Sequence, residues 1–241
     1  MFCRPRFLHI VAGLFVVVGC VAVLASPAHA AIFTVDDPID LTDANPGDGV
    51  CATSANTCSL RAAAMEVDAQ GGSHTILVPA GTYVLSIDPA GETGLIPNRG
   101  DLDFRFLGVG GEVEIIGAGA DVTVIRRAGS SAAHRIFDIG DQVSSAKISG
   151  LTIMDGSDTL GGGIRTAATL WLEEVLLQNN SSSTDGSALY ATGNGFLSIV
   201  RSAFVSNTDG GIGPTISVGG SSEGARSRAP PRSSPDSASS R

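Results

Sequence analysis

Aromatic and basic residues are scarce in this chain. Aromatic residues make up 5% of its 241 residues, its only lysine is Lys147, and its formal charge is −9. So few aromatic side chains cannot build a large aromatic core, and with 31 glycines they favour a repetitive fold of thin, turn-rich layers. A surface this acidic repels phosphate groups, which argues against nucleic acid and anionic lipid as partners.

Residues 1–30 have the pattern of a signal peptide. Arg4 and Arg6 make a positive start, and the apolar run Ile10 to Leu24 is shorter than the roughly 20 residues that a membrane span needs. Ala28-His29-Ala30 places small residues where signal peptidase requires them. We therefore expect cleavage after Ala30, an extracellular or cell-envelope location, and a mature chain without a transmembrane helix. Cleavage removes both arginines and no acid, so the formal charge becomes −11.

The four cysteines divide between the signal segment and the mature chain. Val17-Val18-Gly19-Cys20 offers an alternative, a lipoprotein signal, although apolar residues continue past the cysteine. Cleavage after Ala30 leaves only Cys51 and Cys58. An even count in an exported chain predicts a disulfide, and the C-x6-C spacing fits neither a zinc knuckle nor a thioredoxin-like pair.

A short helix is predicted after the second of these cysteines. Ser59 is a good N-cap, and Gly71-Gly72 ends the pattern, because glycine adopts the left-handed closing conformation. Leu60, Ala63, Ala64 and Val67 share one face at helical spacing. We expect an amphipathic helix that covers the open end of a stack of strands.

The loop before the helix is rich in aspartate. It contains Asp36, Asp37, Asp40, Asp43 and Asp48, and carboxylate oxygens are ligands that Ca²⁺ prefers. The spacing is not that of an EF-hand, since the bidentate glutamate is missing. We expect no cofactor, and Ca²⁺ binding by this loop is kept as a hypothesis.

Short β-prone runs recur along the rest of the chain at a regular interval. Ile148, Leu172 and Ile199 begin similar segments and lie 24 and 27 residues apart, and Asn180 and Asn207 follow at the same 27-residue offset. This period is typical of one turn of a parallel β-helix, with asparagines stacked at equivalent turns. The expected strands are 75–78, 82–87, 112–116, 122–125, 136–139, 147–154, 169–177 and 195–205.

The last segment departs from this pattern. Residues 219–241 hold no aliphatic residue larger than alanine, so we expect a disordered tail that cannot complete another turn. Because solenoids need terminal caps, a truncated or frame-shifted end of a longer surface protein is an alternative interpretation.

Several of these segments carry a family resemblance. Cys58-Ser59-Leu60-Arg61-Ala62-Ala63 resembles the signature of the CSLREA-domain family, with Ala62 where that family usually has glutamate. Phe204-Val205-Ser206-Asn207 and Gly210-Gly211-Ile212 resemble repeats of polymorphic outer-membrane proteins. Both resemblances imply an exported or surface-displayed right-handed parallel β-helix, of the pectin lyase-like kind, and carry over no catalytic residue.

No catalytic constellation stands out among the acids of the repeats. Glu173 and Glu174 are expected to alternate across a strand, so that only one faces a given groove. Trp171 is expected to be partly buried packing, far from Tyr190, so no sugar-stacking platform is predicted. The acids considered are Asp101, Asp103, Asp138, Asp155, Asp158, Glu173 and Glu174.

Together these patterns predict an all-β chain with four parts. They are a signal peptide (1–30), an N-terminal cap with the CSLREA-like motif (31–74), parallel β-helix coils (75–218) and a disordered tail (219–241). We expect an adhesive or structural surface protein without catalysis, with a polysaccharide or a host or cell-surface component as partner. The alternative is a polysaccharide-active β-helix, lyase or glycosidase-like, or a glycan-binding one. The site residues that the sequence identifies are the disulfide cysteines, Cys51 and Cys58.

Overall fold

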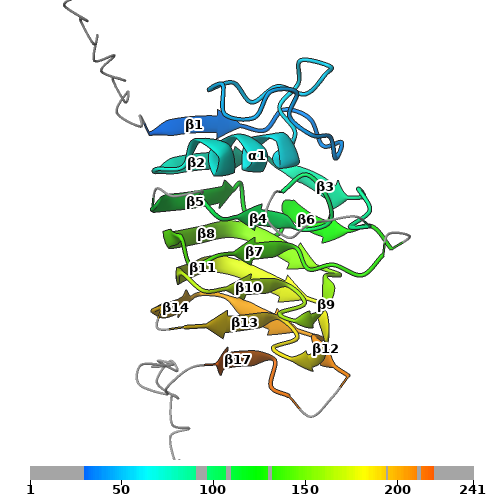
Figure 1. The fold of residues 1–241 in the computed structure, drawn as a ribbon. Coiled ribbons are helices and arrows are strands. Elements are labelled where there is room, and N and C mark those ends of the chain that lie inside the picture. The colour runs from blue at the N-terminus through cyan, green and yellow to red at the C-terminus, as the bar shows by residue number, and fades with distance from the viewer. Residues whose placement is uncertain are drawn as a thin grey trace, which may run out of the picture.

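The computed structural model describes residues 30–90, 97–106, 110–129, 132–193, 195–210 and 213–219. The expected signal peptide except Ala30, and the expected tail except Gly219, lie outside the described residues. The described part is mostly β, with one helix, α1 (Leu60–Gln70), and three sheets whose strands pair in parallel (Figure 1). None of its helices is long and apolar enough to cross a membrane.

The strands are distributed over sheets that we name A, B and C. Sheet A contains β1 (Ala31–Thr34), β2 (His74–Val78), β3 (Gly81–Leu85), β5 (Gly111–Gly117), β6 (Thr123–Arg127), β8 (Val143–Met154), β11 (Thr169–Gln178), β14 (Leu197–Val200) and β15 (Ala203–Val205). Sheet B contains β4 (Leu102–Phe104), β7 (Phe137–Ile139), β10 (Ile164–Thr166), β13 (Leu189–Thr192) and β17 (Ile216–Gly219). Sheet C contains β9 (Ser157–Leu160), β12 (Ser181–Asp185) and β16 (Thr208–Asp209).

The chain visits the three sheets in a fixed cyclic order. From β8 in sheet A it passes to β9 in sheet C and β10 in sheet B, then returns to sheet A as β11. The same circuit follows once more, through β12 and β13 to β14, and a third pass through β15 and β16 reaches β17 in sheet B. In Figure 1 the successive strands of sheet A lie one above another from β1 to β14. Each circuit therefore adds one layer to the stack.

The register of sheet A matches the predicted repeat. Leu172 pairs with Ile148 on one side and with Ile199 on the other, and Leu177 pairs with Phe204. Ile148 and Leu172 are buried, with exposed fractions of 0% and 1%. The repeat thus stacks like residues above one another and fills the interior with aliphatic side chains.

Residues in the left-handed backbone conformation bend sheet A at equivalent positions of successive layers. They are Gly150, Glu174 and Arg201, with φ angles of 61°, 56° and 49°, and each directly follows a residue that pairs with the neighbouring layer. At Gly150 only glycine fits, because a Cβ would lie 2.8 Å from the carbonyl oxygen of Gly117. The same bend breaks the predicted strand 195–205 into β14 and β15, which corrects that prediction.

The predicted asparagine ladder is confirmed. Asn180 is fully buried, and its Nδ2 donates to the Oδ1 of Asn207 at 3.0 Å and to the carbonyl oxygen of Ile153 at 3.0 Å. Its Oδ1 accepts from the backbone N–H of Gly156 at 3.0 Å. The amides therefore satisfy the backbone at a corner where the strand ladder is interrupted.

Helix α1 lies where a helix was predicted, but nine of its eleven residues, Leu60 to Asp68, are buried, so it has no broad solvent-exposed face. Ser59 is the N-cap and Gly71 the C-cap, and the predicted apolar face is buried beside β2 and β4. Arg61, Glu66 and Asp68 on its other sides are buried as well. The aspartate-rich loop binds this polar side: Glu66 accepts hydrogen bonds from the backbone N–H groups of Gly47 and Gly49.

Candidate functional site

The segment from Cys51 to Ala62 joins the aspartate-rich loop to helix α1. Cys51 and Cys58 form a disulfide with their Cα atoms 5.1 Å apart, as the cysteine count predicts. The Ser59 hydroxyl accepts from the backbone N–H of Ala62 at 3.0 Å and donates to the carbonyl oxygen of Leu41 at 2.5 Å. Ala62 is fully buried. These contacts are structural ones between the helix and the loop.

Arg61 is the central cation of this cap. Its side chain is fully buried, and its Nε lies 2.6 Å from the Oδ1 of Asp40. The two terminal nitrogens donate to backbone carbonyl oxygens of the segment that leads into β4, namely those of Pro97, Gly100 and Asp101. The guanidinium therefore ties the aspartate-rich loop to sheet B through charge-assisted hydrogen bonds.

The five acids of the loop do not converge on one point. Among the described residues, no three of them bring carboxylate oxygens together as a metal-binding group. Each accepts hydrogen bonds within the loop or its neighbours instead. The donors are the backbone N–H of Cys58 for Asp36, that of Ile39 for Asp37, those of Ser86 and Ile87 for Asp40, those of Asn45 and Ala52 for Asp43, and that of Val50 for Asp48. The hydrogen bond from Ile39, followed by one from the Thr57 hydroxyl, lowers the pKa of Asp37.

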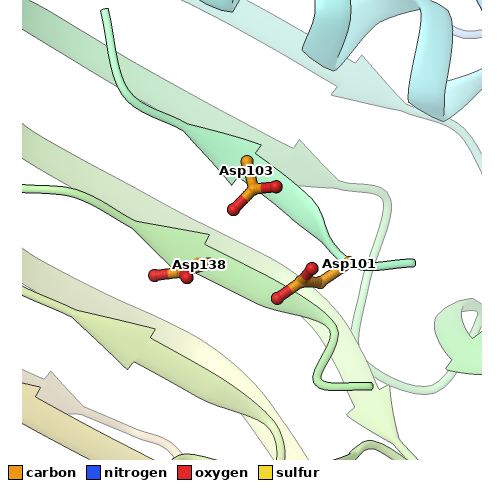
Figure 2. Close-up of side chains that lie close together, drawn as sticks. All are labelled: Asp101, Asp103 and Asp138. Atoms are coloured by element: carbon orange, nitrogen blue, oxygen red, sulfur yellow. The ribbon is translucent and has the colours of Figure 1, made fainter. Parts of the chain in front are cut away.

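Three other acids do lie together on sheet B. Asp101, Asp103 and Asp138 are buried, and one oxygen of each lies within 4.8 Å of the others (Figure 2). Asp103 and Asp138 are partners on β4 and β7, and Asp101 immediately precedes β4. The register of the parallel strands thus brings Asp138 beside Asp101 and Asp103, which precede it by more than 30 residues.

Arginines occupy the space around this acidic cluster. The Nη1 of Arg135 lies 3.0 Å from Asp101 and 2.9 Å from Asp138, and its Nη2 lies 3.0 Å from Asp158. Arg105 and Arg165 also pair with Asp138. Burial is the largest single influence on the Arg165 guanidinium and lowers its pKa. The hydrogen bond to Asp138 and the negative charges of Asp138, Asp101 and Asp158 together outweigh burial, so the pKa is raised. Three guanidinium groups against the carboxylates favour an ion-pair network over a metal site.

The outward face of sheet A carries an open groove. It has a volume of about 500 Å³ and crosses the strands from β2 to β14. One row of partners in register runs along it: Thr75, Glu114, Lys147, Trp171 and Ser198. Because neighbouring strands lie about 4.8 Å apart, this row extends over roughly 19 Å.

The charges of the groove are predominantly negative. Glu112, Glu114 and Glu173 line it together with one cation, Lys147. The Nζ of Lys147 lies 3.1 Å from Glu114 and 3.9 Å from Glu173, and all three side chains are partly exposed. The groove therefore offers carboxylate acceptors with one ammonium between them.

One expectation about this face is wrong. Trp171 is 38% exposed and thus partly buried, as expected; it also lines the groove, because sheet A turns alternate residues outward and Trp171 is in an outward position. Glu173 and Glu174 do not alternate across the strand. The left-handed bend at Glu174 leaves both outside, where both pair with Arg201. Tyr190 lies on sheet B, apart from Trp171, as expected.

Glu112, Glu114 and Lys147 were not identified from the sequence. They belong to no motif, and only the register of the sheet places them beside Trp171. Comparisons of this chain with protein-family models, with curated proteins and with solved structures found no match.

Proposed function

We propose that this chain is exported, folds as a right-handed parallel β-helix and acts as an adhesive or structural surface protein without catalysis. The cyclic passage through sheets A, C and B supports the helical path. Crossovers between parallel strands of one sheet are right-handed in about 98% of cases, which supports the hand. The disulfide suits an extracellular protein.

The observation that carries an adhesive role is the groove on sheet A. Five neighbouring strands each contribute one outward side chain to a single row, and the row includes the chain's only tryptophan. A straight row across stacked strands matches an extended polymer better than a compact small molecule. The occupant that we propose is therefore a polysaccharide chain lying along the stacking axis.

The charge of the groove narrows the class of polysaccharide. Carboxylates accept hydrogen bonds from hydroxyl groups and pair with ammonium groups, whereas they repel uronates. Three carboxylates against one ammonium thus favour a neutral or amino-substituted polymer. We assign no catalytic step, because Glu114 and Glu173 are engaged by Lys147 and Arg201.

Size-exclusion chromatography tests this function. The mature protein is incubated with a neutral, an amino-substituted and a uronate polysaccharide, with and without Ca²⁺. We expect co-elution with one of the first two, unchanged polymer length and no requirement for Ca²⁺. Trp171→Ala should abolish co-elution, while Tyr190→Ala, on sheet B, should not. Shortened polymer would establish an enzyme instead, and binding of the uronate alone would contradict the charge argument.

A further inference from the structure

The first strand of sheet A begins beside a buried histidine. β1 starts at Ala31, and its backbone nitrogen donates to the Nδ1 of His74 at 3.3 Å. Ala31 and His74 are also partners in the parallel pairing of β1 with β2. The residue expected to follow signal cleavage thus places its nitrogen against an imidazole.

The hydrogen bonds of His74 fix its acceptor. Its Nε2 lies 2.6 Å from the carbonyl oxygen of Gly71, and a carbonyl can only accept, so Nε2 carries the proton. Nδ1 therefore presents a lone pair to Ala31. The ring is 4% exposed and packs beside Phe33, with the ring centroids 6.0 Å apart. This is a buried, oriented acceptor aimed at one nitrogen.

The position of the Ala31 nitrogen, near the C-terminal end of α1, suits a positive charge. Gly71 is the C-cap of α1, and the last turn of α1 contains no basic residue. The C-terminal end of a helix carries a partial negative charge that favours a nearby cation. His74 links that end of the helix to the nitrogen of Ala31.

We propose that His74 is the binding site for the α-amino group of the processed chain, an inference that rests on the proposed export. Hydrolysis of the Ala30–Ala31 amide consumes one water, which leaves a carboxylate on Ala30 and an ammonium on Ala31. The ammonium then donates to Nδ1 in a charge-assisted hydrogen bond, stronger than that of the amide. Since Ala30 lines the groove on sheet A, its removal also opens that end of the groove.

Amine chemistry tests the proposal, because the mature chain has only two kinds of amine, the α-amine and the Nζ of Lys147. The exported protein is first weighed by mass spectrometry, and acylation rates of both amines are then measured. We expect a chain that begins at Ala31, with an α-amine that reacts about tenfold more slowly than in a chain that retains Ala30, equivalent to about 1.4 kcal/mol. His74→Ala should abolish that difference, and the rate at Lys147 should not change.

The outcomes distinguish the proposed export from the proposed role of His74. A chain that keeps residues 1–30 would refute export itself. A chain that begins at Cys20, or one that begins at Ala31 with an α-amine as reactive as in the Ala30 form, would refute only the role of His74. If His74→Ala does not fold, the ¹⁵N shifts of the wild-type imidazole decide: a proton on Nδ1 instead of Nε2 would overturn the proposal. His134→Ala, which replaces another buried histidine, is the control for a general loss of packing and should leave the reactivity of the α-amine unchanged.

Discussion

Replacing Arg61 should destabilise the cap more than any surface arginine would. Arg61→Met leaves Asp40 as a buried carboxylate, 1% exposed, without its ion-pair partner, and removes the donors to three carbonyl oxygens. Breaking a buried ion pair by removing one partner costs about 3–5 kcal/mol. That is a large share of the roughly 5–15 kcal/mol by which a domain is stable.

Urea unfolding followed by far-ultraviolet circular dichroism measures this loss. With a slope of about 2 kcal/mol per molar urea, a loss of about 4 kcal/mol lowers the midpoint by about 2 M. Arg126→Met is the matched control, because Arg126 is 40% exposed in its ion pair with Asp155. Exposed pairs contribute about 0–1 kcal/mol, so its midpoint should shift by less than about 0.5 M.

A double variant isolates the pair itself. If Asp40 and Arg61 stabilise each other, the losses of unfolding free energy from Asp40→Asn and Arg61→Met should not add. Once one partner is replaced, replacing the other no longer leaves an unpaired buried charge. Strictly additive losses, or an Arg61→Met loss no larger than that of Arg126→Met, would refute the assignment of Arg61 as the central cation of the cap.

Three further predictions concern the ladder, the disulfide and pH. Asn180→Ala should cost about 2–3 kcal/mol in thermal unfolding, because three hydrogen bonds worth about 1 kcal/mol each are lost in a fully buried site; Asn207→Ala, in a partly exposed position, should cost less. Reduction of Cys51–Cys58 should lower stability by roughly 2 kcal/mol, because it frees a short closed loop, whereas the Cys51→Ser/Cys58→Ser protein should not respond to reductant. Burial lowers the pKa of His134 below 6.5, so its contribution to stability is fully present above about pH 6.5 and is lost as the pH falls below that value. The stability of His134→Gln in urea unfolding should therefore rise relative to that of the wild type as the pH falls from 7 to 5. A stability difference between the two proteins that stays constant over this range would contradict the prediction.

The stacked architecture could be predicted because its signal is repeated. Ile148, Leu172 and Ile199 are aliphatic, lie 24 and 27 residues apart and pair in register, so each copy supports the others. The helix was also predictable, since Ser59 and Gly71 mark its ends. Here local propensity and the packed structure agree.

Most short strands of sheets B and C escaped prediction for a physical reason, although β7 lies within the predicted strand 136–139. β12 is Ser181–Asp185, a run without any apolar alternation, and it is held as a strand by pairing with the layers on either side. β4 has only three residues and contains a buried aspartate, Asp103. The ion pairs of this region join Asp138 to Arg105 and Arg165 from the neighbouring layers, which no local pattern indicates.

The groove was missed for a related reason. Alternation along one strand shows which of its residues point outward, but outward residues of different strands have no sequence relation to one another. Glu114, Lys147 and Trp171 become neighbours only once the register of β5, β8 and β11 is known.

Fluorescence of the only tryptophan tests the central claim most directly, because Trp171 lies in the proposed groove. The mature protein is titrated with the neutral or amino-substituted polysaccharide that co-elutes with it. The account predicts a saturable change in Trp171 emission whose midpoint matches the binding midpoint, and a weaker affinity in Glu114→Ala. Binding of the polymer without any change in Trp171 emission would place the contact surface elsewhere and contradict the account.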